Sequence, residues 1–109
     1  MKIRWNEVPA KGKDEKHVAR EIDCETFYLT LHEYEPGWAD ESHQHPEAQF
    51  GHILKGSMQV YVEGKEVIEQ KEGQSAFIRS MVKHRSANPT ERTIALNLYY
   101  LKHARSSDK

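Results

Sequence analysis

The strongest constraint on the fold of this chain is a two-residue alternation of apolar and polar side chains. Residues 26–34, which read TFYLTLHEY, alternate in this way and are rich in aromatic and other strand-favouring residues. Residues 57–62 alternate again and lead through Glu63 and Gly64 into residues 65–68, a pattern that predicts a hairpin with Gly64 in its tight turn. Because successive side chains of a strand point to opposite faces, the alternation predicts half-buried β-strands.

Turn signals divide the rest of the chain into further short segments. We expect strands at residues 50–54, 76–79 and 93–101. Residues 11–20 are the only stretch with helical leanings, but they are charged and their pattern is ambiguous, so they are interpreted as a loop that leads into a strand. Many short strands, closely spaced turns and almost no helical pattern predict an all-β sandwich or small barrel.

The charge balance excludes some classes of partner. The chain has 109 residues, with 16 basic and 17 acidic side chains and a net charge of -1. This length fits one domain, and no net field is present to attract nucleic acid or an anionic membrane. No apolar segment approaches the ~20 residues of a membrane span, and residues 1–7 lack the apolar stretch of a signal peptide. We therefore expect a cytoplasmic protein with neither kind of partner.

The low apolar content predicts help from a metal, a second subunit or both. Hydrophobic residues make up 37% of the chain and the mean hydropathy is -0.88, so the core is thin for a domain. Because sandwich edges invite pairing, we expect a homodimer. Cys24 stands alone, which fits a reducing compartment, and is interpreted as structural.

The segment that carries chemistry is residues 37–56. On an extended chain His43 and His45 project to the same face, so both imidazoles can reach one cavity. Gln49 lies at an even offset from His45 and can return to that face. A third imidazole must come from another strand, and His84 is the best candidate. Three imidazoles and one oxygen ligand suit Zn, Fe, Ni, Cu or Mn.

These segments resemble the two conserved motifs of the cupin superfamily. The first motif, G-x5-H-x-H-x3,4-E-x6-G, is matched by Gly37, His43, His45 and Gly56, with Gln49 in place of the usual glutamate. The second, G-x5-P-x-G-x2-H-x3-N, is matched by Gly73, His84 and Asn88, with Arg79 and Met81 replacing its proline and second glycine. The resemblance implies a single cupin barrel, a jelly-roll-like antiparallel β-sandwich over residues 1–103, followed by a polar tail at 104–109.

The resemblance also implies a divalent transition metal, either Zn, Ni, Fe, Mn or Cu, with His43, His45, Gln49 and His84 as ligands. A neutral amide leaves the charge of the dication uncompensated, which favours Lewis-acid chemistry over redox cycling. Glu47 is the rival for the fourth position, because it is the only carboxylate between the histidines and Gln49.

Within the cupins, the string His-x-His-Pro-x-x-Gln is similar to that of small single-domain proteins that linearise pectin-derived unsaturated uronates. Polyketide-cyclase cupins are built on the same scale. In the uronate group a carboxylate, an aromatic residue and an arginine near the last strand assist catalysis, and here Asn97, Tyr99 and His103 stand at those positions. Tyr99 and Asn97 are therefore candidate catalytic residues, although an amide cannot take up a proton.

Three functions follow as hypotheses. The first is a metalloenzyme in which the metal polarises a hydroxyl, carbonyl or enolate oxygen of a small oxygen-rich metabolite, in isomerase, lyase or cyclase chemistry. The second is a dioxygenase that uses Fe or Cu. The third is a non-catalytic small-molecule-binding or sensing module with a structural metal.

Other residues have simpler interpretations. His52 is expected on the outer surface or at a subunit interface, and His17, His32 and His103 are expected to be solvated. Aromatic and methionine residues on strands are interpreted mainly as core, with a cavity lining as the alternative: Tyr28, Phe50, Met58, Tyr61, Phe77 and Tyr99. Either face of residues 93–101 can line the cavity. Arg79 and Arg85 are interpreted as surface residues, with a substrate carboxylate as the alternative partner.

Overall fold

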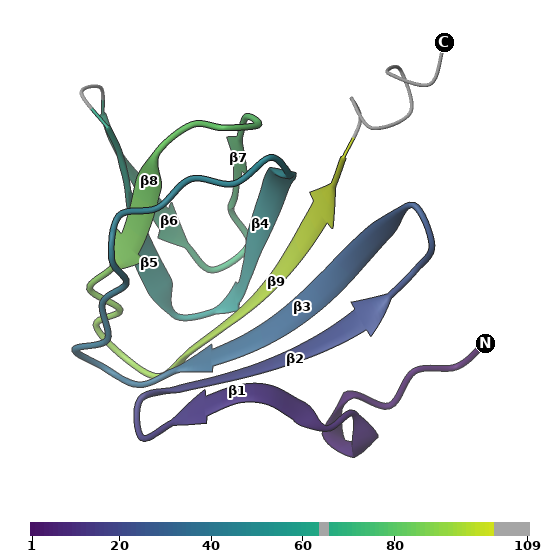
Figure 1. Cartoon of the computed structure of the whole chain (residues 1–109). Coiled ribbons are helices and arrows are strands. Elements are labelled where there is room, and N and C mark those ends of the chain that lie inside the picture. Colours follow the sequence, from purple (N-terminus) through teal and green to yellow (C-terminus); the bar gives the residue numbers. More distant parts are fainter. Residues whose placement is uncertain (64–65, 102–109) are drawn as a thin grey trace, which may run out of the picture.

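The chain forms short antiparallel strands almost throughout (Figure 1). The computed structural model describes residues 1–63 and 66–101. In chain order these hold the 3₁₀-helix η1 (Trp5–Glu7) and the strands β1 (Ala10–Asp14), β2 (His17–Asp23), β3 (Phe27–Tyr34), β4 (Ala48–Lys55), β5 (Ser57–Val62), β6 (Val67–Lys71), β7 (Ser75–Ile78), β8 (His84–Ala87) and β9 (Thr93–Tyr100). The predicted Gly64 turn, His103 and the tail at 104–109 lie outside the described residues.

The strands build two sheets that face one another (Figure 1). The larger sheet has six strands in the order β1-β2-β3-β9-β4-β7, and the smaller has three in the order β6-β5-β8. All their pairings are antiparallel. The predicted all-β sandwich is confirmed. Within the described residues, no helix is long and apolar enough to cross a membrane.

The interpretation of residues 11–20 as a loop is wrong. They form most of the hairpin β1–β2, and β2 pairs with β3 from His17↔Tyr34 to Asp23↔Tyr28. The side chains of β2 are nearly all half-buried, so the sequence shows no alternation between a buried and an exposed face. Tertiary pairing therefore sets this strand, and its local pattern does not reveal it.

The core lies between the two sheets, with Met58 of β5 packed on the inner face of the larger sheet. Tyr34, Ile53, Met58 and Ala95 form the buried cluster, and Trp38 packs against it. Gly56, which follows β4, has a φ of +93°, and a Cβ there would overlap with buried Thr93. Glycine at this position thus lets the turn between β4 and β5 pack directly on β9.

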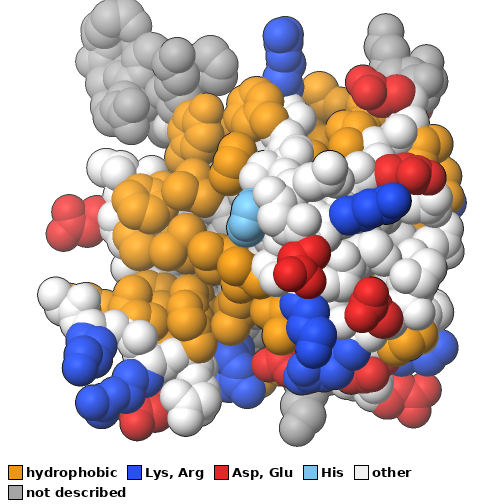
Figure 2. Space-filling view, turned by 180° about the vertical axis from the view of Figure 1, so that it is seen from behind, with side chains coloured by type: hydrophobic (Ala, Val, Ile, Leu, Met, Phe, Trp, Pro, Cys, Tyr) orange, Lys and Arg blue, Asp and Glu red, His pale blue; other side chains and the backbone are white. Residues whose placement is uncertain are grey.

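The outer face of the same sheet is apolar. Register places Ile22, Leu29, Leu98, Phe50 and Phe77 in one row across five strands. Phe50 and Phe77 are 45% and 50% exposed, so the prediction that they lie in the core or line a cavity is wrong. Seen from behind, apolar side chains gather in a broad patch (Figure 2). Contiguous exposed patches of this kind mark interaction surfaces.

The two faces of β9 are now assigned. Thr93, Ala95 and Asn97 are buried on the inner face, where Tyr99 follows them, and the alternate residues belong to the outer face. The sequence left open which face of residues 93–101 lines the cavity. In the structure it is the inner face, which carries Asn97 and Tyr99.

A buried polar chain crosses the inner face beside the core. His17 Nε2 lies 2.8 Å from His32 Nδ1, and His32 Nε2 lies 2.7 Å from Thr30 Oγ1. Both imidazole rings stack on Tyr34. His32 is only 9% exposed and His17 is half-buried, so the prediction that they are solvated is wrong. Burial, and then the nearby His17, lowers the pKa of His32 from 6.5 to about 3.

This pKa predicts acid sensitivity. The folded protein binds fewer protons at His32 than the unfolded chain between pH 6.5 and about 3, so the stability falls as the pH falls through that window. From pH 7 to pH 5, His32 alone should lower the free energy of unfolding by about 2 kcal/mol. His32→Gln should flatten this slope in denaturant titrations, whereas His52→Gln on the outer face should not. Identical slopes for wild type and His32→Gln would contradict the prediction.

Candidate metal centre

Backbone hydrogen bonds bring the three predicted histidines together. His43 and His84 form an isolated antiparallel bridge, in which each backbone N–H donates to the carbonyl of the other, at 2.9 and 2.8 Å. Met81 N–H donates to the carbonyl of His45 at 2.8 Å. The segment before β4 is therefore fastened to the segment that leads into β8, and this fixes the positions of all three side chains.

The three imidazoles point into a common space. One ring nitrogen from each lies within 4.8 Å of the others. The ring centroids of His43 and His84 are 4.6 Å apart, and those of His45 and His84 are 5.1 Å apart. In the part of the chain that the structure describes, this is the one group of three or more histidine, cysteine or acidic side chains with such spacing.

A backbone carbonyl accepts a hydrogen bond from Nδ1 of each ring. The acceptors are Glu41 O for His43 at 2.8 Å, Glu47 O for His45 at 2.9 Å and Val82 O for His84 at 2.8 Å. These bonds place the proton on Nδ1 and leave the Nε2 lone pair free, which is the tautomer of a metal-binding histidine. Nε2 of His45 is buried without a hydrogen-bond partner. The donor set therefore fits a divalent transition metal.

Local electrostatics favour the neutral form of His84. Burial lowers the pKa of His84, and the neighbouring His43 and His45 lower it further, against the opposing effects of the Val82 hydrogen bond and Asp40. Asp40 Oδ2 lies 3.2 Å from His43 Nδ1, on the side of the ring away from the shared space. A carboxylate in this position orients a ligand imidazole and increases its basicity.

The two candidates for a fourth ligand lie in different surroundings. Gln49 lines the cavity of about 320 Å³ that also holds His43 and His84. The Glu47 carboxylate lies 3.6 Å from His45 Nδ1, the nitrogen turned away from the shared space, and it lines a separate cavity. This placement favours Gln49 over Glu47.

The candidate catalytic residues lie beside the cluster. Tyr99 and Asn97 line the histidine cavity, and the Tyr99 ring meets His45 edge-on at 5.8 Å between centroids. Asn97 Nδ2 donates to the Tyr99 hydroxyl at 3.2 Å. Burial raises the pKa of Tyr99, against hydrogen bonds from Asn97 and Thr30 that lower it. Asn97 therefore orients the Tyr99 phenol. Gly51 leaves room for the Asn97 side chain, because a Cβ at residue 51 would lie 2.7 Å from Asn97 Oδ1.

Part of the cavity wall consists of residues that the sequence did not predict to line it. His17, His32, Trp38 and Asp40 line it as well. Asp40 stands three residues before His43, a spacing that suggests a supporting carboxylate. No local signal marks His17 and His32, since their burial depends on how β2 pairs with β3.

Three predicted surface residues are placed away from the cluster. His52 Nδ1 lies 2.7 Å from Ser75 Oγ on the outer face, as expected from its odd offset to Gln49. Arg85 lies over the Tyr61 ring at 4.3 Å, and Arg79 is exposed. Neither arginine lines the histidine cavity.

Comparison with known proteins decides the family. The sequence matches the cupin domain over residues 30–99. The chain belongs to the cupin family. No curated protein matches its sequence.

Solved cupin structures share this fold at low sequence identity. AerE from Microcystis aeruginosa is 23% identical with a TM-score of 0.79, over 86% of this chain and 46% of its own. KdgF from Halomonas sp. is 14% identical with a TM-score of 0.77, over 93% of this chain and 94% of its own. A mutant of the oxalate decarboxylase OxdC from Bacillus subtilis is 18% identical with a TM-score of 0.81, over 90% of this chain and 28% of its own. The chain thus spans less than half of the AerE structure and nearly all of KdgF. At these identities the likeness concerns the fold.

The geometry around Gln49 predicts the order of metal affinities. Gln49→Ala should weaken Zn²⁺ binding about 10-fold, and Gln49→Glu should tighten it, because a carboxylate is the stronger ligand. Glu47→Gln is the matched control and should stay within about threefold of wild type. Competition with a chromophoric chelator measures all three. A loss in Glu47→Gln as large as that in Gln49→Ala would make Glu47 the ligand.

Proposed function

We propose that this cupin is a metal-dependent enzyme that acts on a small oxygen-rich metabolite. His43, His45 and His84 would hold a divalent transition metal, with Gln49 as the fourth ligand. The reaction would be of the isomerase, lyase or cyclase type. An oxalate decarboxylase and DMSP lyases are among the proteins that share the fold.

One observation carries this proposal. All three imidazoles donate through Nδ1 to backbone carbonyls, so their Nε2 atoms are the ones left for a common cation. A bound divalent metal supplies Lewis-acid polarisation of a hydroxyl, carbonyl or enolate oxygen. The neutral Gln49 supports this chemistry over oxygen activation, because no ligand carboxylate offsets the charge.

The remaining tasks fall to Tyr99 and Asn97. The half-buried Tyr99 phenol next to the cluster can donate a hydrogen bond to a substrate oxygen or pass a proton. Asn97 would hold that phenol in place through its amide. Tyr34, Trp38 and the paired His17 and His32 form another part of the cavity wall.

Metal loading and turnover test the proposal together. Purified protein should carry about one divalent metal per chain, and EDTA should lower its Tm. Excess Zn²⁺, Mn²⁺ or Ni²⁺ should restore the Tm. Proton NMR against unsaturated uronates, hydroxy acids and oxo acids should show turnover that His84→Ala abolishes and His52→Ala keeps.

Three results would contradict this function. Purified protein that contains no metal and has the same Tm with and without EDTA would contradict the metal site. Oxygen uptake by Fe(II)-loaded protein with catechol or flavonol substrates would assign it to the dioxygenases. Loss of stability in His84→Ala with unchanged affinity for a bound uronate, hydroxy acid or oxo acid would indicate a binding module with a structural metal.

The protein would work in the cytoplasm as a homodimer, with a second copy covering the outer face of the larger sheet. Strands β2, β3, β9 and β4 are seven or eight residues long and β7 has four, so with strands about 4.8 Å apart this face covers roughly 440 Å² in projection. The side-chain surface over that area exceeds its projection and approaches the roughly 600 Å² per partner of a small stable dimer. A flat apolar row that crosses five strands can match itself across a twofold axis.

Charge placed in this face should separate the subunits. Phe50→Asp with Phe77→Asp should shift the mass in light scattering from twice 12.7 kDa to 12.7 kDa. Val67→Asp is the control, because Val67 is an equally exposed apolar residue (49%) on the smaller sheet. A monomeric wild type, or a double variant that stays dimeric, would contradict the assignment of this face.

A further inference from the structure

A second cavity adjoins the metal centre at the end of the sandwich where β3 and β9 meet the segment before β4. We propose that this cavity binds the positively charged, alkylammonium end of a small molecule. The role of this molecule as the substrate rests on the proposed function, whereas the preference for an organic cation follows from the cavity alone.

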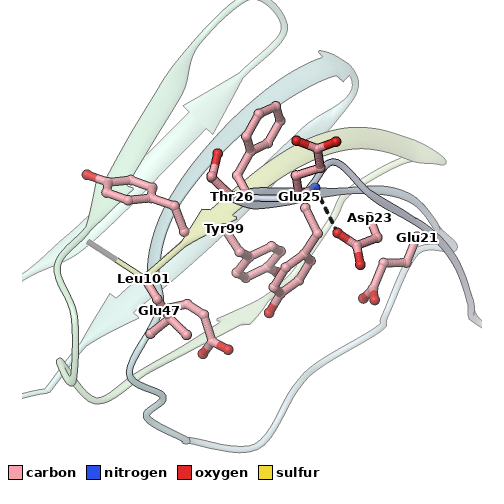
Figure 3. A pocket seen from close by; sticks show the side chains of 10 residues that line it. Glu21, Asp23, Glu25, Thr26, Glu47, Tyr99 and Leu101 are labelled. Atoms are coloured by element: carbon pink, nitrogen blue, oxygen red, sulfur yellow. Dashed lines mark hydrogen bonds between the residues drawn. The ribbon is translucent and has the colours of Figure 1, made fainter. Parts of the chain in front are cut away.

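Aromatic rings form the floor of the cavity (Figure 3). Its volume is about 430 Å³. Tyr28 and Tyr99 stack with their centroids 4.9 Å apart and their planes 13° from parallel. Phe27, Tyr100 and Leu101 add apolar wall. Such a cavity accepts alkyl groups, and the faces of its rings attract cations.

Carboxylates supply the rim. The four acidic lining residues are Glu21, Asp23, Glu25 and Glu47. Lys11 Nζ already lies 2.9 Å from Glu21. Within the described residues, no lysine or arginine lines the cavity, and no ion pair engages Asp23 or Glu25. Figure 3 shows Glu47 on one side of Tyr99, with Glu21 and Asp23 on the other. The cavity therefore favours a cation and disfavours an anion.

The phenols do not add charge of their own. Burial, then the nearby Glu47 and Tyr99, raises the pKa of Tyr28 to about 12. Burial also raises the pKa of Tyr99. Both rings are therefore neutral at physiological pH, and they present π faces and hydroxyl groups to a bound ligand.

Sheet register connects this cavity to the candidate metal centre. Asp23, Tyr28, Tyr99 and Gln49 are successive cross-strand partners on β2, β3, β9 and β4. With strands about 4.8 Å apart, Asp23 lies three strands, or roughly 14 Å, from Gln49. A ligand along this row would have its cationic end at Asp23 and its other end at the histidines.

The other end of the row meets the candidate metal centre through Tyr99 and His45. Tyr99 lines both cavities. Glu47 O accepts a hydrogen bond from His45 Nδ1, and the Tyr99 ring lies edge-on to His45. The acidic cavity and the histidine cavity are therefore distinct and share Tyr99 as a common wall.

A matched pair of probes tests the proposal. Choline and 3,3-dimethylbutan-1-ol have the same shape and differ in the positive charge. By NMR titration choline should bind at least roughly fivefold more tightly. Choline should shift the protein resonances of Tyr28, Tyr99 and Glu47. Propionate should not bind in this cavity. Equal affinities of choline and the neutral alcohol, or tighter binding of propionate, would overturn the proposal.

Charge-neutral variants locate the cation. Asp23→Asn with Glu25→Gln should weaken choline binding roughly fivefold. The backbone N–H of residue 25 donates to Asp23 Oδ1 at 2.9 Å, and the amide oxygen that the first substitution introduces can still accept this bond. Glu7→Gln with Glu72→Gln, two exposed carboxylates elsewhere, is the control and should leave the affinity unchanged. Loss of affinity in both pairs alike would show general charge attraction and contradict a local site.

One further variant separates this proposal from the metal-dependent function. His84→Ala should lose metal binding and keep its choline affinity, so the cation site can stand if the metal enzyme fails. Loss of choline binding in His84→Ala together with loss of the metal would contradict a separate cation site.

Discussion

The metal centre depends on where three imidazole rings direct their protons. Each ring donates Nδ1–H to a backbone carbonyl, and the paired backbone bonds of His43 and His84 hold two of the rings in register. The chain therefore fixes both the position and the tautomer of the three candidate ligands without any cation. Since backbone atoms supply the acceptors, the arrangement needs no particular side chain except in its outer support, which Asp40 provides.

In the larger sheet, alternate side chains of each strand face opposite sides, and this alternation separates the remaining features of the structure. The inner face of this sheet carries the buried His17–His32 pair and the row from Asp23 to Gln49 and packs on the core, while its outer face is apolar. One strand pairing thus specifies the cavity, the proposed cation subsite and the proposed dimer face together. A shift of one residue in β9 would exchange the two faces and remove all three.

The sequence revealed the parts of this account that depend on short spacings. His43 and His45 follow from the strand period, and the two motifs supply His84. Because neighbouring residues of a strand face opposite sides, Phe50 must face outward if Gln49 faces inward. The aromatic character of Phe50 alone favours the core. The sequence could not reveal β2, because its half-buried side chains show no alternation. With β2 unseen, the burial of His17 and His32 and the placement of Glu21 and Asp23 beside Tyr28 stayed hidden, since they depend on long-range pairing.

The most direct measurement of the central claim is the tautomeric state of the ligand histidines. Long-range proton–nitrogen NMR of ¹⁵N-histidine-labelled, metal-free protein at neutral pH reports which ring nitrogen carries the proton. We expect Nδ1–H and an unprotonated Nε2 at His43, His45 and His84, with the three Nε2 resonances shifting together when Zn²⁺ is added. Protonated Nε2 in any of the three, or Zn²⁺ shifts confined to one ring, would contradict a shared cation site.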